Sequence, residues 1–407
     1  MAVFNRADIL LPKDADMTKW SVVACDQYTS ERGYWESVDE FVGDEVSTSK
    51  LILPEVYLSD ADVSRRIEKI NRTMRNYLDS GVFSEYKNSY IYVERTLSNG
   101  NMRAGVVGCV DLEQYDYRPG SRSAIRATEK TVTERIPPRL KVRSNAALEL
   151  PHVMLLIDDD TRTIIESLAE QKPKFKKLYD FDLMMNSGHI TGWIVNDDAA
   201  EVLEDRLEQL ADREYFENKY HIPGASPLAF AVGDGNHSLA TAKEYCTKYA
   251  DSNLLARYAL VELVNLHDDS LVFEPIHRVI FGADNEKFEK GLAKLCEAGG
   301  NQKFTLIADG KEREMSFANP TSSLTVGSVQ NYIDSYIAEN GGSADYIHGE
   351  DVVRSLVSEG NIGILLPAMD KNDLFKTVIS DGALPRKTFS MGEAEDKRFY
   401  TEARAIR

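Results

Sequence analysis

Residues 228–245, LAFAVGDGNHSLATAKEY, join an apolar run to a helical pattern through a glycine-rich turn. The run from Leu228 to Val232 has the length and composition of a buried strand. Beyond the turn, apolar and aromatic residues recur at the three- and four-residue steps of a helix face, at Leu239, Ala242, Cys246 and Tyr249. A strand that turns directly into a helix gathers free backbone N–H groups and the positive end of the helix dipole at one point. The segment therefore predicts an anion site between a strand and a helix.

The turn itself, GDGNHS, has two interpretations. As a phosphate site, Gly235 lets the chain approach an anion, the N–H groups of Asn236 to Ser238 point at it, and the side chains of His237 and Ser238 donate further hydrogen bonds. Asp234 then binds Mg²⁺ or accepts a proton from a nucleophile. The alternative is a tight turn with Ser238 or Asn236 as helix N-cap. Capping does not account for the strand-end acid together with the histidine, so the phosphate site is favoured.

Bulk composition narrows the class of protein. The 407 residues are enough for two or three domains, and the net charge of −18 argues against a general DNA or RNA binder, which needs a basic face. The N-terminal residues lack a signal-peptide pattern, and no apolar run reaches the length of a membrane span. The cysteines are scattered without a C-x-x-C pair, at Cys25, Cys109, Cys246 and Cys296. We expect a cytoplasmic, reduced protein with no nucleic-acid or membrane partner.

Strand and helix patterns alternate along the whole chain. Helices are expected at 60–81 and 199–210, and strands at 89–95, 103–112, 152–158, 228–232, 257–266 and 271–282. The pattern restarts beyond Gly282 without a flexible linker. The sequence therefore predicts a mixed fold between α/β and α+β. It divides into an α/β catalytic region over 1–282, which carries the turn, and an α+β region over 283–407 packed on it.

A second motif, FEPIHRVIF, places His277 and Arg278 among apolar neighbours. Arginine is the natural fork for a carboxylate or a phosphate. A structural arginine paired with a buried acid explains the pattern equally well, so the motif alone does not decide.

Three charged stretches complete the set of candidates. ATEKTVTERIPPRLKVR at 127–143 is by itself a charged loop leading into a helix. In VACDQYTSERGYW at 23–35, apolar residues give way to Asp26 and Glu31, and capping chemistry explains the hydroxyl residues between them. The C-terminal stretch at 384–407 is expected to be mostly a surface helix.

Taken in order, these stretches resemble a bacterial and archaeal family catalogued as domain of unknown function number 1015. The landmarks span nearly all of the chain: VACDQYTS, TEKT and PPRLKVR before VMLLIDD, VGDGNHS, SLVFEPIHRVI, and GALPRKTFSMGEAEDKRFYTEAR. Family members often show Asp-Gly-His-His-Arg at the turn, where this chain has Asn236 and Ser238. A role that needs a guanidinium at position 238 is therefore not carried over.

The Asp-Gly-x-His turn is also similar to that of the ParB and sulfiredoxin superfamily, which includes free serine kinases. The resemblance implies a ParB/sulfiredoxin-like core and phosphoryl transfer to free L-serine, giving O-phosphoserine. It implies ATP, ADP or pyrophosphate as donor, with Mg²⁺ as the expected metal. The expected partners are then small-molecule substrates, and the protein is a candidate homodimer.

Residue roles follow from the chemistry of phosphoryl transfer, which needs charge neutralisation, in-line positioning and a proton acceptor. The candidate catalytic residues are Asp234, also the candidate metal ligand, with His237 and with Glu31 as a rival base. The candidate phosphate-binding residues are Gly235, Asn236, His237, Ser238 and Arg278. The candidate substrate-binding residues are Asp26, Glu129, Arg139 and His277.

Two other functions share these residues. One is a non-catalytic nucleotide- or phosphate-binding regulatory protein, which keeps the turn but needs no base. The other is a small-molecule phosphohydrolase. Sequence does not separate transferase from hydrolase, because the difference is whether water is excluded from the site.

Overall fold

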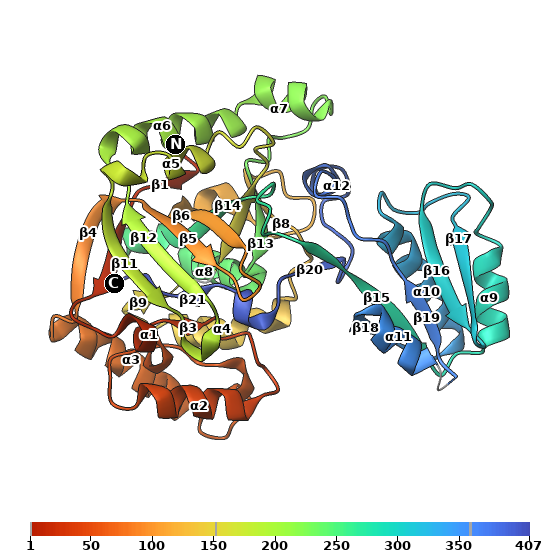
Figure 1. The fold of residues 1–407 in the computed structure, drawn as a ribbon, viewed down its shortest axis with the longest axis horizontal. Helices are drawn as coiled ribbons and strands as arrows, with labels where there is room; N and C mark the ends of the chain where they lie inside the picture. The colour runs from red at the N-terminus through yellow and green to blue at the C-terminus, as the bar shows by residue number, and fades with distance from the viewer. Residues whose placement is uncertain (1, 151–152, 358–359) are drawn as a thin grey trace. The chain divides into compact units, whose positions relative to one another are not determined.

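The computed structural model describes residues 2–150, 153–357 and 360–407, and Figure 1 shows its helices and strands. The chain forms two compact units. The first contains residues 1–271 and 393–407, and the second contains residues 272–392.

The first unit is built on a ten-stranded mixed sheet. Its strands run in the order β11 (Lys176–Asp182), β12 (His189–Ile194), β5 (Ile91–Thr96), β6 (Met102–Asp111), β14 (Tyr258–Asn265), β10 (Met154–Ile157), β13 (Phe230–Asp234), β8 (Ile125–Ala127) and β7 (Tyr115–Asp116), with β1 (Phe4–Asn5) paired to β6. The predicted strand at 152–158 is observed as β10, and its first residue, His152, lies outside the described residues. The expected mixed α/β class is confirmed.

Helices flank this sheet. They are α1 (Met17–Trp20), α2 (Arg32–Val42), α3 (Val63–Asp79), α4 (Ile136–Arg143), α5 (Glu166–Ala169), α6 (Asp197–Leu210), α7 (Arg213–Tyr220) and α8 (Asn236–Tyr249). Within the first unit, α6 and α7 lie on one side and α2 and α3 on the other (Figure 1). The helices predicted at 60–81 and 199–210 are confirmed as α3 and α6, because their apolar faces, including Ile67 and Leu203, are buried.

Strand directions set the position of the predicted turn. β13 is antiparallel to β10, with Asp234 opposite Met154, so the carboxyl end of β13 adjoins the amino end of β10. β10 is parallel to β14, so the carboxyl ends of these two strands both lie at the end of the sheet opposite to the turn. Helix α8 follows β13 directly, and Leu239, Ala242 and Cys246 are buried as their spacing predicts. The strand–turn–helix prediction is confirmed.

The C-terminal segment differs from its prediction. The surface helix expected over 384–407 is wrong: short strands replace it, and β21 (Phe399–Tyr400) pairs with β3 (Val22–Val23). β22 (Arg404–Ala405) pairs with β9 (Leu148–Glu149), and β2 (Ala7–Pro12) pairs with β4 (Phe83–Ser89) nearby in a further small sheet. The segment is buried because its charges have partners: Arg398 Nε lies 2.9 Å from Glu262 Oε2, and Arg398 also pairs with Glu402.

The second unit is an α+β structure with a six-stranded sheet. Its strands run in the order β17 (Lys311–Ser316), β16 (Lys303–Ala308), β19 (Ile362–Leu365), β15 (Phe273–Phe281) and β18 (Ser343–His348), with β20 (Phe389–Met391) paired to β15. Its helices are α9 (Asn285–Ala293), α10 (Thr325–Asn340), α11 (Glu350–Val357) and α12 (Asp373–Asp381). The division expected after residue 282 differs from the observed units, because β15 pairs with strands of the second unit and residues 393–407 belong to the first.

Across the described ranges, no helix combines the length and the apolar character that crossing a bilayer requires.

Candidate functional site

The turn between β13 and α8 is built around Gly235. Its φ of +80° lies in the left-handed region, and a Cβ added there would lie 3.0 Å from the Cα of Val153. Both facts favour glycine. Asp234 ends the strand, and its Oδ1 accepts the N–H of Gly235 at 2.9 Å. The turn therefore fixes one carboxylate oxygen and leaves Oδ2 available to other partners.

The amino end of α8 has the features of an anion site. Gly235 is the N-cap residue, and within the described part of the chain no side chain caps the helix. The N-cap role expected as the alternative for Ser238 or Asn236 is therefore wrong, since both lie inside the first turn. Asn236 Oδ1 is buried without a hydrogen-bond partner among the described residues. The helix start thus has the positive dipole end, and at Asn236 and His237 the first-turn backbone N–H groups, that bind anions elsewhere.

Lys397 brings a positive charge to the turn. Its Nζ lies 3.4 Å from Asp234 Oδ2, and the two side chains are only 18% and 25% exposed. Sequence reasoning assigned Lys397 no role, because it expected a surface helix in this segment. The sequence feature that could have indicated a role for Lys397 is its place in the landmark GEAEDKRFYTEAR, where a basic pair stands between acidic and aromatic residues.

The backbone around Lys397 is held on several sides. Arg95 Nη1 donates to the carbonyl of Lys397 at 2.7 Å, and Arg103 Nη1 donates to that of Asp396 at 3.2 Å. The N–H of Ala24 donates to the carbonyl of Arg398 at 3.0 Å. Both arginines are buried, so these bonds are shielded from water. The ammonium of Lys397 is therefore presented to the turn from a fixed main chain.

His237 is neutral in this environment. Burial, followed by the charges of Arg139 and Arg135, lowers its pKa to about 4, while the charge of Asp26 acts in the opposite direction. Its Nε2 accepts the N–H of Val132 at 3.2 Å. A neutral ring that accepts at Nε2 carries its proton on Nδ1. His237 can therefore donate one hydrogen bond at neutral pH without adding a positive charge.

Arg139 lies in α4 and pairs with a residue that the sequence did not indicate. Its Nη2 binds Glu55 Oε1, and its Nη1 donates to the carbonyl of Arg135 at 2.8 Å. Glu129, the other predicted substrate residue of this stretch, is half-buried two residues after β8. Glu55 follows a short apolar run, LILP, and no spacing in the sequence links it to α4.

Asp26 and Glu31 lie in the segment between β3 and α2. Asp26 is half-buried and accepts a hydrogen bond from Gln27 Nε2 at 3.1 Å. Glu31 is exposed and directly precedes α2. Burial, then the charges of Glu395 and Glu31, raise the pKa of Tyr28 to about 12. The predicted roles of Glu31 in proton acceptance and of Asp26 in substrate binding stay predictions.

His277 and Arg278 belong to the second unit. Arg278 is fully buried, and its guanidinium donates to Gln330 Oε1 at 2.8 Å and to main-chain carbonyls, including that of Ile276 at 2.6 Å. His277 Nδ1 accepts the N–H of Leu366 at 3.1 Å. These contacts fit the structural interpretation, with carbonyls in place of the expected acid. Neither residue enters the site proposed below.

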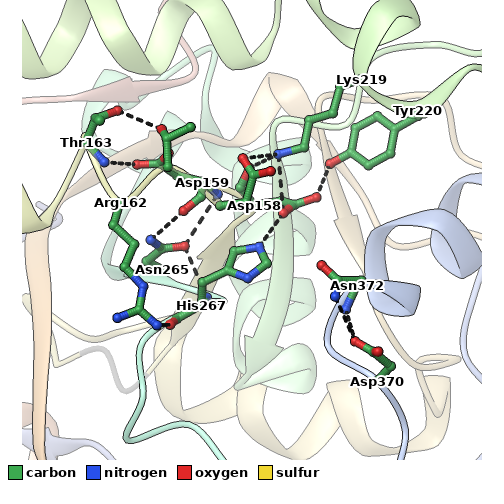
Figure 2. A network of polar contacts seen from close by, with 12 residues as sticks. Asp158, Asp159, Arg162, Thr163, Lys219, Tyr220, Asn265, His267, Asp370 and Asn372 are labelled. Carbon is green, nitrogen blue, oxygen red and sulfur yellow. Dashed lines mark hydrogen bonds and ion pairs between the residues drawn. The ribbon is translucent and has the colours of Figure 1, made fainter.

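A second polar network lies at the opposite end of these strands, just after the carboxyl ends of β10 and β14 (Figure 2). Asp158 accepts hydrogen bonds from His267 Nε2 at 2.7 Å and from the Tyr220 hydroxyl at 2.6 Å. Burial raises the pKa of Asp158, but the bond from His267 and the charge of Lys219 outweigh it and hold this pKa below its usual range. The sequence analysis assigned none of these residues a role in a site. Because they satisfy one another, they fix the loops at this end.

Metal ligation has one candidate residue. Within the ranges that the structure describes, no group of three or more histidine, cysteine, aspartate or glutamate side chains is placed to hold a metal ion. Mg²⁺ is often bound through one or two carboxylates together with substrate phosphates. Asp234 fits that mode, and its role as a metal ligand stays a prediction.

The family assignment follows from the sequence itself. The model of the family described as "Protein of unknown function (DUF1015)" matches residues 7–336, and the chain belongs to this family. No curated protein matches the chain significantly. The resemblance inferred from the motifs is thus confirmed at the level of the family.

Solved structures give a weaker likeness. A mutant free serine kinase in complex with AMP aligns with a TM-score of 0.39 and 10% identity, covering 72% of this chain and 90% of that one. A conserved hypothetical protein from Pyrococcus furiosus aligns with a TM-score of 0.36 and 11% identity, covering 72% and 92%. C-terminally truncated SbnI from Staphylococcus aureus aligns with a TM-score of 0.37 and 8% identity, covering 70% and 82%.

Proposed function

We propose that this protein is a small-molecule kinase that transfers a phosphoryl group from ATP, ADP or pyrophosphate to free L-serine, giving O-phosphoserine. The observation that carries the proposal is the turn itself. A strand-end carboxylate on Asp234, a helix start without a capping side chain and the ammonium of Lys397 meet around Gly235. This is the combination that phosphoryl transfer needs: an anion cradle, a cation and a base.

The donor's terminal phosphate binds at the amino end of α8. The N–H groups of Asn236 and His237 supply hydrogen bonds that need no reorganisation, because the helix already holds them. Lys397 neutralises part of the phosphate's charge. His237 donates from Nδ1 and leaves its charge unchanged. The turn thus binds the phosphate mainly through fixed dipoles, together with the ammonium of Lys397.

Asp234 accepts the proton of the acceptor. As the serine hydroxyl oxygen attacks the terminal phosphorus, its O–H bond breaks and the proton passes to Oδ2 of Asp234. The bond from phosphorus to the donor's bridging oxygen breaks, and the electron pair leaves with ADP, AMP or phosphate. Mg²⁺ carried by the donor would be held by the same carboxylate and would lower the charge on the phosphates. Glu31 remains the rival base.

A screen of acceptors and donors tests the proposal. The full chain is incubated with Mg²⁺, each of ATP, ADP and pyrophosphate, and a panel of hydroxyl compounds that includes L-serine, and products are read by mass spectrometry. We expect a mass increase of one phosphoryl group on serine. Release of inorganic phosphate without a phosphorylated acceptor would indicate a phosphohydrolase. Donor binding without any turnover would favour the regulatory binding protein.

A further inference from the structure

The first unit contains a cavity beside the proposed phosphate site. It has a volume of about 160 Å³ and lies among α4, α8 and residues 51–58. Ser238, in the first turn of α8, forms part of its wall and connects it to the turn. Most of its lining is apolar and includes Leu53, Leu58, Val142, Leu239, Ala242 and Leu260. A dry apolar cavity of ~150 Å³ is large enough for a benzene-sized group.

Among the described residues that line the cavity, two ion pairs interrupt the apolar wall, Arg143 with Glu149 and Arg139 with Glu55, and they differ in how far their acids are buried. Glu149 is buried and saturated, since it accepts from Arg143, from Arg404 and from the N–H of Leu260. The pair of Arg139 and Glu55 is different. Both residues line the cavity, and neither side chain is fully buried, with exposed fractions of 16% and 18%.

The pair of Arg139 and Glu55 has the charge pattern of a zwitterion's complement. A free α-amino acid carries a carboxylate and an ammonium two bonds apart. Arg139 matches the first by its bidentate fork, and Glu55 matches the second. When the amino acid binds, the ion pair between Arg139 and Glu55 is replaced by one pair to the ligand's carboxylate and one to its ammonium. The net charge of the pocket does not change, and no charge is left unpaired. A plain anion or cation would leave one partner unpaired.

The cavity contains one cysteine, and it does not change the chemistry. Burial, followed by the charge of Asp26, raises the pKa of the Cys25 thiol to about 12. The thiol is therefore protonated at neutral pH and is a poor nucleophile. The cavity is a binding site rather than a site of covalent capture.

We propose that Arg139 and Glu55 bind the α-carboxylate and α-ammonium of an amino acid whose apolar side chain fills this cavity. For the proposed kinase, the cavity extends the acceptor class from serine to β-hydroxy amino acids with an apolar β-substituent, of which threonine is the smallest. The acceptor role rests on the proposed function. The binding site itself does not, because it needs no phosphoryl donor.

Calorimetry on the full chain without donor tests the site. Glycine, alanine, 2-aminobutyrate and valine form a series in which the apolar side chain grows. We expect binding to tighten about fourfold for each methylene-sized group that becomes buried. Isovalerate, which lacks the ammonium of valine, and isobutylamine, which lacks the carboxylate, should each bind at least about tenfold more weakly than valine.

Variants that fill the cavity provide the matched control. Ala242→Leu and Ala146→Leu place extra carbon atoms in the lining, and each should remove the advantage of valine over glycine while glycine still binds. Ala225→Leu, in the loop before β13 and outside the cavity, should leave the series unchanged. If a filled variant does not fold, the ligand series on the unmodified protein still decides.

The outcomes separate this inference from the proposed function. Affinities that stay flat or fall from glycine to valine overturn the amino-acid site, even if the protein phosphorylates serine. Tight binding of valine with no phosphorylated product from threonine or serine supports the site and removes the proposed kinase activity. Phosphorylation of threonine with a lower KM than serine supports both.

Discussion

His237 reports the electric field at the turn. Burial and the charges of Arg139 and Arg135 lower its pKa from the ordinary 6.5 to about 4. This difference corresponds to about 3 kcal/mol by which the folded protein disfavours the charged ring, before solvent screening of the partly exposed side chain reduces it. At pH 5.5 an ordinary histidine is about nine-tenths protonated, whereas His237 should be only about 3% protonated. The contrast can be measured at a pH above the pI of about 5.0, where the protein is least soluble.

The assay is NMR of the chain labelled at its histidine rings, titrated from pH 8 to pH 5.5. His237→Gln assigns the resonance, because the glutamine oxygen can still accept the N–H of Val132. We expect the His237 signal to stay at its neutral shift, with the proton on Nδ1. Arg139→Met should raise the pKa of His237, since the charge of Arg139 lowers it more than that of Arg135 does. A midpoint near 6.5 in the unmodified protein would refute the burial and charge argument.

The same resonance tests for an anion at the turn. A phosphate beside α8 adds negative charge that opposes the two arginines, so inorganic phosphate or ADP should raise the pKa of His237. If either ligand saturates the protein without moving this pKa, the anion binds elsewhere.

The low pKa also sets the sign of a stability change. Between pH 6.5 and about 4 the unfolded chain takes up a proton at residue 237 that the folded chain does not. The stability contributed by this group is therefore fully present above pH 6.5 and falls as the pH is lowered through this window. Chemical unfolding of the unmodified protein and of His237→Gln, compared at pH 7.5 and pH 5.5, measures it. A difference between the two that does not vary with pH contradicts the assignment.

Two further predictions concern the residues around the turn. Lys397→Met should weaken ADP binding about ten- to a hundredfold in calorimetry, because it removes a charged hydrogen-bond donor; the exposed Lys176→Met should not, and equal effects would remove Lys397 from the site. Gly235→Ala should lower the free energy of unfolding by about 2–4 kcal/mol, because the new Cβ adds a contact with Val153 to the left-handed strain. Gly224→Ala has nearly the same φ, with nothing within 4 Å, and should cost only about 1–2 kcal/mol; equal losses would argue against the contact.

Local patterns predicted the central part of the fold well. The strand β13, the helix α8 and the glycine between them follow from an apolar run, a 3.6-residue period and a φ that only glycine adopts easily. These are short-range properties, and the sequence displays them directly. The mixed α/β class was also expected from alternating strand and helix patterns.

Long-range pairings decided what could not be predicted. The C-terminal segment has the charge density of a surface helix, and it is buried only because Arg398 finds Glu262 and Glu402 as partners. Lys397 reaches the turn through that burial. Glu55 pairs with Arg139 across 84 residues of sequence, and no local period encodes such a contact. The motif of Arg278 left an anion ligand and a structural arginine equally open, because a local pattern does not reveal which main-chain carbonyls its guanidinium contacts.

The role of Asp234 is the central claim, and one substitution tests it most directly. Asp234→Asn keeps the size of the side chain and its bond to the N–H of Gly235, but it removes the charge that accepts the proton. Turnover of the substrate pair found in the screen should fall by about 10²–10⁴. Donor affinity in calorimetry should be retained or increased, because backbone N–H groups supply the binding and a neighbouring negative charge is lost. A folded Asp234→Asn protein with full turnover would contradict the account.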